Sequence, residues 1–591
     1  MRRDFTTSAA SDKTGELRAL LGAVSTALGE AAFLPGTSPE APGMRALGRA
    51  KRIVESKLAV EVEADFATPL VAAVLGGTNV GKSTLFNATL ESAVSSIDPR
   101  AGHTVCAVAA APAASCEAAT RLFSGYRVVE GRAGAGADVD DDCVFVAETP
   151  TPGDAVVIDS PDVDSALNVH HVRAYDALIA SDVVLFVTSP TKYNDKRCVD
   201  VLRDAIAMGK RLVVLFNLLP PEDDAARGGS RGEILRDFSR SVPGARTAEV
   251  LTFAAVPGAG PDDVARELAA GAGAARAALT EAAASRAKTK RSVCAAGAAY
   301  LVQYLKEPLA ELRAQAQSLD ATRAAGDRIA SGARDDYLAY LRGREFLELE
   351  VVLRRLLDRF RVPVLDDALD LISAVPRWLA GAILRRPTLD DRMAAADAER
   401  RDKELELLGR ARVAFAKSLE ERSGDEAARY LYGRIVSVDY FTRDLAADLA
   451  ARDEARSSER AAWLKGFEGE LVGTIESSPG VRTLIKSVRA VLELGSGIAA
   501  AVLTGGIGTG DLLWAPAAGK AAQAIVSTVG NRYFDDKRRE YVRLQAASFE
   551  AAAEAALFAR LREGIPTTPR VDVVEELSRD VRRLAKVFGG I

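Results

Sequence analysis

The sequence predicts an α/β domain with a doubly wound, mostly parallel sheet, followed by a large all-α helical bundle or stalk. Between residues 68 and 270, short and fully apolar runs alternate with helical patterns, which is typical of a parallel sheet covered on both faces. Farther along, apolar residues recur at helical spacing, and residues 388–478 contain no proline. Hydrophobic residues make up 48% of the chain, so a core can be buried and whole-chain disorder is excluded.

The expected elements follow in chain order. Residues 1–14 are polar and predict a disordered tail. Helical patterns at 16–29 and 44–64 make residues 15–67 a set of N-terminal helices that pack on the helical domain. Residues 68–270 form the α/β domain, and residues 271–591 form the bundle or stalk. Polar insertions at 131–142 and 222–232 predict surface loops, and the apolar runs predict strands at 71–75, 105–109, 155–158, 183–187, 212–216 and 250–254.

Charge and cysteine usage exclude several function classes. Lysine and arginine total 77 against 82 acidic residues, a formal charge of -5. Because no global basic field results, a nucleic-acid partner is not expected, and such a role would need a local basic patch. Five cysteines without a CxxC pair, and only three histidines, predict neither a structural zinc site nor a disulfide framework. The polar first residues do not form a secretory signal, which predicts a cytoplasmic protein.

A phosphate-binding loop is the strongest local signal. Lys82 and Ser83 end a GxxxxGK[ST] pattern that follows an apolar strand and opens a helix. Backbone N–H groups of such a loop cradle phosphate oxygens, the lysine reaches the β- and γ-phosphates, and the serine hydroxyl binds Mg²⁺. The pattern therefore predicts a P-loop NTPase domain whose phosphate-binding residues are Gly76, Gly77, Thr78, Asn79, Val80, Gly81, Lys82, Ser83 and Thr84.

Two further residues fall where a P-loop domain needs Mg²⁺ ligands. Thr104 precedes an apolar run, so it could contact Mg²⁺ and the γ-phosphate from a switch loop. Asp159 directly follows the apolar run 155–158, which is the usual position of a second Mg²⁺ anchor that acts through water. The plainer alternatives are an ordinary loop threonine and a strand-end cap. Together with Ser83, these residues make up the predicted metal site.

These motifs resemble those of a known family. The stretches GGTNVGKSTLFN at 76–87 and IDSPD at 158–162 resemble the GTPase domain of the Era, EngA, MnmE and dynamin-like group. The resemblance covers residues 68–270, and helices on both sides of that domain resemble dynamin-like proteins in particular. It implies binding of GTP and GDP, Mg²⁺-dependent hydrolysis with catalytic roles for Lys82, Thr104 and Asn79, and self-association through the GTPase domain or the helices. Asn79 matches an asparagine that helps some members to hold K⁺, unless it only shapes the loop.

The second switch segment departs from the family pattern DxxG. It reads Asp159, Ser160, Pro161 and Asp162, so an aspartate stands in the glycine position. Asp162 lacks the backbone freedom of glycine, and its carboxylate is an unfavourable neighbour for a polyphosphate unless it points away or toward the metal. Val163 follows, where Ras-like proteins carry a water-orienting glutamine. The attacking water would then be oriented by another group or by dimerisation.

The guanine-reading motif [NT]KxD is also altered. Asn217 is in place, but Leu218 stands in the lysine position and Pro220 in the aspartate position. A proline side chain cannot accept the two hydrogen bonds of the guanine edge, so base selectivity is expected to weaken. Asp223 or Asp224 would substitute only after a shift of the loop. The resemblance therefore favours GTP, while these residues alone leave guanine and adenine both open.

The three histidines carry little functional signal. His170 and His171 follow the switch segment on an expected helix, and an exposed helix face explains them better than catalysis does. His103 lies beside Thr104 and has equally weak claims to a catalytic role.

Two apolar stretches raise the question of membrane contact. An apolar hairpin is predicted near 490–530, where neither half reaches the roughly 20 apolar residues of a spanning helix. Residues 371–386 combine a tryptophan and arginines with an apolar stripe, which suits an interfacial helix. Dynamin-like proteins often carry an apolar tip that enters a bilayer, whereas the plain alternative for both stretches is buried bundle core.

Three functional hypotheses remain. The leading one is a Mg²⁺-dependent GTPase of dynamin-like or Era-like type, cytoplasmic or peripheral at a membrane surface, that acts as a nucleotide switch. The second is an interaction or scaffold protein whose GTPase domain no longer turns over, with weakened guanine recognition. The third is a ribosome- or RNA-associated GTPase, which ranks last because no basic, aromatic-interleaved RNA module is evident.

Overall fold

The computed structural model divides the chain into two compact units. The first comprises Met1–Gln317 and Thr567–Ile591, and the second comprises Ser318–Pro566. The first boundary falls inside helix α11 (Lys306–Gly343). The structure describes residues 4–97, 106–123, 126–131, 143–165, 168–217, 231–242, 249–252, 261–359, 389–436, 444–479, 483, 486, 525 and 529–590.

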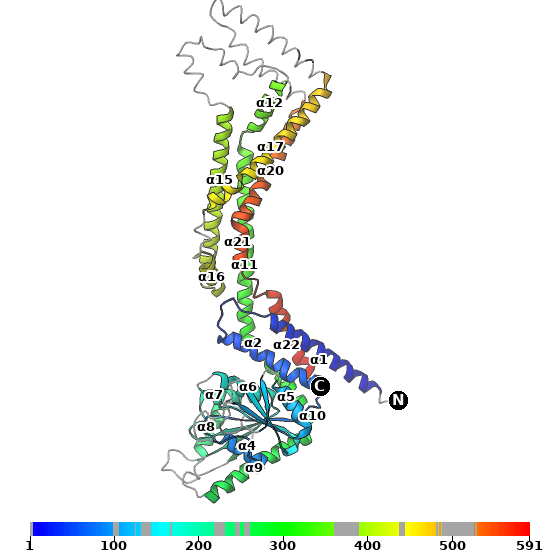
Figure 1. Ribbon diagram of the computed structural model, residues 1–591, viewed down its shortest axis with the longest axis vertical. Coiled ribbons are helices and arrows are strands. Elements are labelled where there is room, and N and C mark those ends of the chain that lie inside the picture. Colours follow the sequence, from blue (N-terminus) through cyan, green and yellow to red (C-terminus); the bar gives the residue numbers. More distant parts are fainter. Residues whose placement is uncertain are drawn as a thin grey trace, which may run out of the picture. The chain divides into compact units, whose positions relative to one another are not determined.

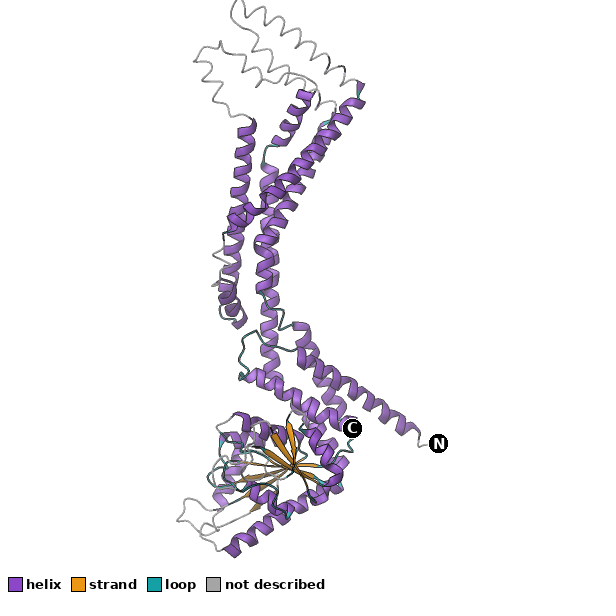
Figure 2. Ribbon diagram, in the orientation of Figure 1, coloured by secondary structure: helices purple, strands orange, loops and turns teal. Residues whose placement is uncertain are grey.

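One sheet organises the first unit (Figures 1 and 2). Within the described residues it has eight strands, in the order β3-β4-β2-β5-β1-β6-β7-β8. Strands β2 and β5 pair antiparallel, and all other neighbours are parallel, which confirms the doubly wound, mostly parallel prediction. The strands are β1 Val71–Gly76, β2 Ala107–Ala111, β3 Arg127–Glu130, β4 Cys143–Glu148, β5 Val156–Asp159, β6 Val183–Thr188, β7 Arg211–Phe216 and β8 Glu249–Thr252.

Strands β3 and β4 are additions to the six that the apolar runs predict. Strand β3 precedes the acidic stretch predicted as a loop, and β4 follows it. Strand β3 lies at the edge of the sheet, and its side chains are partly exposed. Residues 132–142 of that loop and residues 218–230, which include most of the second predicted loop, lie outside the described residues.

Helices cover both faces of the sheet (Figure 1). Successive residues of a strand point to opposite faces, and apolar residues of β1 pack on both. Ala73 and Leu75 of β1 pack on one side, and Ala72 and Val74 on the other. The first side is covered by α5 (Cys116–Leu122), α6 (Asn168–Ala180), α7 (Lys196–Ala207) and α8 (Arg231–Ser241). The second is covered by α4 (Lys82–Leu90) and α9 (Pro261–Ala284), and short 3₁₀ turns lie at Ala113–Ser115 and Pro152–Asp154.

A separate helical core completes the first unit. Its N-terminal part is α1 (Asp4–Glu30), α2 (Pro42–Arg52), a π-helical turn (η1, Ile53–Ala59) and α3 (Val60–Glu63), and it packs on α10 (Arg286–Tyr304) and α22 (Val571–Phe588). Helix α1 begins at Asp4, within the segment predicted as a disordered tail. Apolar positions of α22 at helical spacing, such as Leu577, Val581 and Leu584, are fully buried there.

Four buried charges join the N-terminal helices to the sheet. Asp182, just before β6, accepts hydrogen bonds from Lys57 of η1 at 2.5 Å and from Lys290 of α10 at 2.8 Å. Glu61 of α3 accepts from the same two ammonium groups, at 3.2 and 2.7 Å. The second oxygen of Asp182 also accepts from the Val71 backbone N–H at 2.9 Å. All four side chains are nearly inaccessible, so each charge depends on the others for compensation.

The network predicts a pH dependence of stability. Burial alone would raise the pKa of Asp182, but Lys57 and Lys290 hold it well below its usual range. A lowered folded-state pKa stabilises the fold above the unfolded-state pKa, about 4 for aspartate, and this contribution is lost as pH falls below it. We expect the difference in free energy of unfolding between wild type and Asp182→Asn to shrink between about pH 5 and pH 2. Chemical denaturation at several pH values checks this, and a constant difference would contradict it. The charged groups facing Asp182 are Lys57, Glu61, Lys290 and Lys210.

The described part of the second unit contains helices and no strand, as the sequence predicts for this half. Helix α17 packs against α12 and α20 around Phe467, Leu471 and Phe534. The candidate membrane stretches 371–386 and 490–530 lie outside the described residues, apart from residues 525, 529 and 530. None of the described helices is apolar over the length that crossing a bilayer needs. The elements are α12 Leu347–Arg359, α15 Leu389–Glu420, α16 Glu426–Leu431, η6 Tyr432–Val436, α17 Leu445–Ser477, α20 Asn531–Ala553, η7 Glu554–Phe558 and α21 Ala559–Gly564.

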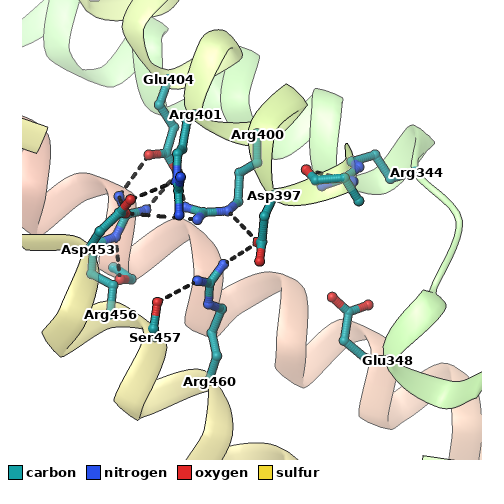
Figure 3. Close-up of polar contacts among 12 residues, drawn as sticks. Arg344, Glu348, Asp397, Arg400, Arg401, Glu404, Asp453, Arg456, Ser457 and Arg460 are labelled. Carbon is teal, nitrogen blue, oxygen red and sulfur yellow. Dashed lines mark hydrogen bonds and ion pairs between the residues drawn. The ribbon is translucent and has the colours of Figure 1, made fainter. Parts of the chain in front are cut away.

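A buried glutamate joins three helices of the second unit. Figure 3 shows Glu404 of α15 facing Arg456 of α17, which donates to both carboxylate oxygens, at 2.6 and 2.7 Å. Arg400 donates a hydrogen bond to Glu404 at 3.0 Å, and the Tyr337 hydroxyl of α11 also donates to Glu404, at 2.7 Å. Burial alone would raise the pKa of Glu404, but Arg456 and Arg400 hold it below its ordinary value. Glu404 is the most deeply buried carboxylate facing these two guanidinium groups, while Asp453 lies 3.9 Å from both and Asp397 lies 3.4 Å from Arg400.

Glu404→Gln should destabilise the second unit by about 2–3 kcal/mol, because the amide keeps the size but removes the charge facing both arginines. All three tryptophans of the chain (378, 463 and 514) lie in this unit, so their fluorescence during denaturation reports it. Glu406→Gln on the same helix is the matched control, since Glu406 pairs with Lys403 and Arg410 at the surface and its loss should leave the transition unchanged. Equal effects of the two substitutions would contradict the prediction.

Candidate functional site

The phosphate loop joins β1 to α4 and requires unusual backbone at three positions. A Cβ on Gly76 would stand 2.1 Å from the Val187 carbonyl oxygen of the neighbouring strand, so only glycine fits there. Asn79 and Gly81 have φ values of 59° and 94°, which asparagine and glycine tolerate best. The positive φ of Asn79 gives this residue a loop-shaping role, and its side chain is exposed.

Other loop residues are fixed by contacts from outside the loop. The Gly77 carbonyl accepts a hydrogen bond from Lys82 at 2.9 Å. The Val80 carbonyl accepts from the Asn217 side chain at 2.8 Å, which ties the end of β7 to the loop. Val80 itself is buried, and Thr84 lies partly buried in the first turn of α4. The predicted residue Asn217 therefore contacts the phosphate loop directly.

A metal-type donor set lies at the ends of β1 and β5. The Oδ2 of the buried Asp159 accepts hydrogen bonds from the hydroxyls of Ser83 and Ser95, both at 2.7 Å. Among the described residues, no group donates to its Oδ1. Burial raises the pKa of Asp159, against the lowering effects of Ser83, Ser95 and Lys82. A buried, unpaired carboxylate oxygen beside a serine hydroxyl is the donor chemistry that Mg²⁺ prefers, so Ser83 and Asp159 fit this cation.

Asp162 pairs with the loop lysine. Lys82 and Asp162 form a buried ion pair, with exposed fractions of 5% and 7%. The sequence leaves two orientations acceptable for this carboxylate, away from the phosphates or toward the metal, and the structure shows a third. The cation closest to Asp162 is the ammonium that the phosphates of a nucleotide would also contact, and opposite charges at a buried position attract strongly.

The rest of the second switch segment is held against β1. The Ser160 hydroxyl donates to the Val74 carbonyl at 3.0 Å and to that of Pro161 at 3.1 Å. The backbone N–H of Val163 donates to the Gly76 carbonyl at 3.1 Å. These contacts hold the segment that carries Asp159 and Asp162 beside β1 and the start of the phosphate loop.

Three site residues were missed at the level of sequence. Asp164 accepts from the backbone N–H and the hydroxyl of Thr78, both at 2.7 Å, and from Lys192 at 2.6 Å. Ser95 joins Ser83 on Asp159. No local pattern marks Ser95 or Lys192, whereas Asp164 could have been suspected as a further carboxylate in an acidic switch segment.

Several predicted residues lie outside the described part of the chain. These are Thr104 and His103 of the first switch loop, and Leu218, Pro220, Asp223 and Asp224 of the base-reading loop. Their roles remain predictions.

The two histidines of the second switch region are not on an exposed helix face. His170 is 3% exposed and its Nδ1 lies 3.0 Å from the Ser165 hydroxyl. The Nδ1 of His171 lies 3.2 Å from the Val163 carbonyl, and burial lowers the pKa of this imidazole. The surface expectation is therefore wrong, because the start of α6 packs back on the switch segment. The contacts of both rings orient the second switch segment.

Comparison with known proteins supports the identity of this domain. Residues 71–218 match the family model described as 50S ribosome-binding GTPase. A search of curated proteins finds no match.

Three solved structures show the range of similarity. One belongs to an oligomerised bacterial dynamin pair described as sensing and tethering membranes (9% identity, 95% of this chain and 96% of that chain, TM-score 0.38). The second is LeoA, a bacterial dynamin GTPase from ETEC (14%, 99% and 98%, TM-score 0.22). The third is a variant of Aquifex aeolicus Era bound to GDP·AlF₄⁻ (20%, 34% and 56%, TM-score 0.21).

Proposed function

We propose that this GTP-binding protein, whose residues 71–218 form a P-loop GTPase domain, hydrolyses GTP with Mg²⁺ and acts as a nucleotide switch. The observation that carries the proposal is the meeting of Lys82, Ser83 and Asp159 at one end of the sheet. These residues supply an ammonium for phosphate oxygens and a hydroxyl and carboxylate for a divalent cation.

The residues would divide the chemistry as follows. The loop N–H groups and Lys82 hold the β- and γ-phosphates and stabilise the negative charge that develops as water attacks the γ-phosphate. Ser83, Thr104 and water-linked Asp159 would hold Mg²⁺, which when bound neutralises charge on the β- and γ-oxygens. Asn79 is a candidate for holding K⁺ beside the phosphates. Val163 offers no group to orient the water, so another residue or a second copy of the chain must do so.

The membrane part of the proposal rests on the resemblance to dynamin-like proteins and on the apolar stretches 371–386 and 490–530. A chain of this kind would self-associate through the GTPase domain or its helices and bind a lipid surface as a peripheral protein. Co-sedimentation of the full chain with anionic liposomes, with GTP, with GDP and without nucleotide, tests this part. Absence from the lipid pellet in all three states would contradict it.

A titration of GTP, GDP and ATP, each with Mg²⁺ and with EDTA, tests the central proposal. Selective, Mg²⁺-dependent binding of GTP and GDP would support it and would mean that the altered base loop still reads guanine. Tighter binding of ATP would show that adenine is the preferred base. Absence of binding would leave the domain as a scaffold.

The scaffold is the second candidate, and the buried Lys82–Asp162 pair favours it, because this lysine is engaged by the protein's own carboxylate. The two candidates differ in turnover. A protein that binds GTP but releases phosphate no faster than its Lys82→Ala variant would be a scaffold rather than an enzyme.

A further inference from the structure

The phosphate loop is contacted by two carboxylates of the second switch segment rather than by one. Asp162 pairs with Lys82, and Asp164 takes the Thr78 backbone N–H and hydroxyl. Lys192 holds the second oxygen of Asp164 at 2.6 Å. Thus the segment that must sense a γ-phosphate brings its own negative charges to the loop.

The donors of Lys82 can be counted. An ammonium has three N–H donors. The Gly77 carbonyl takes one, at 2.9 Å, and the Asp162 carboxylate takes a second. Among the described residues no third partner is recorded, which leaves one donor, enough for one oxygen of a β-phosphate but not for β- and γ-phosphate oxygens together. The pair is 93–95% buried, so water cannot easily replace a lost partner.

Charge repulsion acts in the same direction. The γ-phosphate of GTP adds negative charge beside a carboxylate that sits within contact distance of the lysine it needs. Because the site is buried, such like-charge repulsion is far stronger than in bulk water. GDP brings no phosphate to this position, so Asp162 can stay where it is.

We propose that Asp162 is a specificity-determining residue that makes the resting site prefer nucleoside diphosphate over triphosphate, by holding the place on Lys82 that a γ-phosphate oxygen would take. GTP then binds only when Asp162 leaves Lys82, which moves the switch segment that also carries Asp164. The proposal rests on the proposed function, because it assumes that a guanine nucleotide occupies this loop.

The test compares the dissociation constants of GDP and of a non-hydrolysable GTP analogue for the full chain with Mg²⁺. We expect wild type to bind GDP at least about tenfold more tightly, a difference of about 1.4 kcal/mol. Asp162→Asn keeps the size of the side chain and removes its charge, and Asp162→Gly removes the side chain. Both variants should lower the ratio of the dissociation constant of the GTP analogue to that of GDP by about tenfold or more.

Asp154→Asn is the matched control. Asp154 is exposed in the turn before β5, beside the start of β1, whereas the phosphate loop follows the end of β1. It should leave the ratio unchanged. Circular dichroism establishes that each variant is folded, and the two Asp162 variants serve as independent checks.

The outcomes separate the two levels of inference. If both nucleotides bind and neither Asp162 variant changes their ratio by more than about threefold, this inference is overturned while the proposed function stands. If the Asp162 variants bind GDP and the GTP analogue more tightly by the same factor, Asp162 opposes any phosphate and does not discriminate between them, which also overturns this inference. If wild type and all variants bind no guanine nucleotide, the proposed function fails and this inference fails with it.

Discussion

Asp182→Asn is expected to lower the free energy of unfolding of the first unit by about 3–5 kcal/mol, the usual cost of breaking a buried ion pair. The carboxylate is fully buried and accepts hydrogen bonds from Lys57, Lys290 and the Val71 backbone. An amide would leave two buried ammonium groups facing Glu61 alone. The loss is large because a buried charge without a partner cannot be solvated.

The measurement can be assigned to the correct unit. All three tryptophans lie in the second unit, so the first unit is followed by circular dichroism as a transition that leaves tryptophan fluorescence unchanged. Glu281→Gln is the matched control, because Glu281 pairs with Arg211 at the surface and is 74% exposed. This exposed pair should contribute at most about 1 kcal/mol. A change of the same size in both variants would show that the network is dispensable.

Lys82→Ala is expected to lower the turnover number for GTP by about 10²–10³-fold, which is the usual effect of removing one group that stabilises transition-state charge. The ammonium is buried and held on the Gly77 carbonyl, so its removal takes a fixed positive charge from inside the phosphate loop. Phosphate release at saturating GTP and Mg²⁺ measures the effect.

Lys51→Ala is the control for this measurement, because Lys51 is exposed on α2 and pairs there only weakly with Glu55, at 3.8 Å. It should retain wild-type turnover. Equal rates for wild type and Lys82→Ala would mean that the measured phosphate release does not come from this site, and the scaffold function would then be preferred.

The sequence predicts most of the sheet because its central strands are apolar on both faces. Strands β1, β5, β6 and β7 start or end within one residue of the predicted runs. Strand β3 escapes prediction because it is short, charged at both ends and partly exposed at the sheet edge. Strand β4 has an apolar run like the others, so its signal was present in residues 143–147.

The phosphate loop and its metal donors are also predictable, since a local pattern fixes them. The partners of Asp162 and Asp182 are not. Lys82 lies 80 residues from Asp162, and the two lysines on Asp182 lie 125 and 108 residues away. Which charge meets which is decided by the packing of strands and helices, and no periodicity in the chain records it. The same applies to the pair of Glu404 with Arg456, 52 residues away, whereas Arg400 lies four residues before Glu404 at helical spacing.

The packing of α22 on α1 and α10 has a consequence for how the protein is made. A ribosome delivers the chain from its N-terminus, so α1, with Leu17 and Leu21, emerges first and α22, with Leu577 and Leu584, emerges after the entire second unit. These side chains share one core. During synthesis the apolar face of the N-terminal helices therefore lacks α22 until the end of the chain is made. Until then a chaperone shields this face or α10 covers part of it. Translation that stops before residue 571 would leave that face uncovered, and such truncated chains should aggregate even though their nucleotide-binding domain is complete.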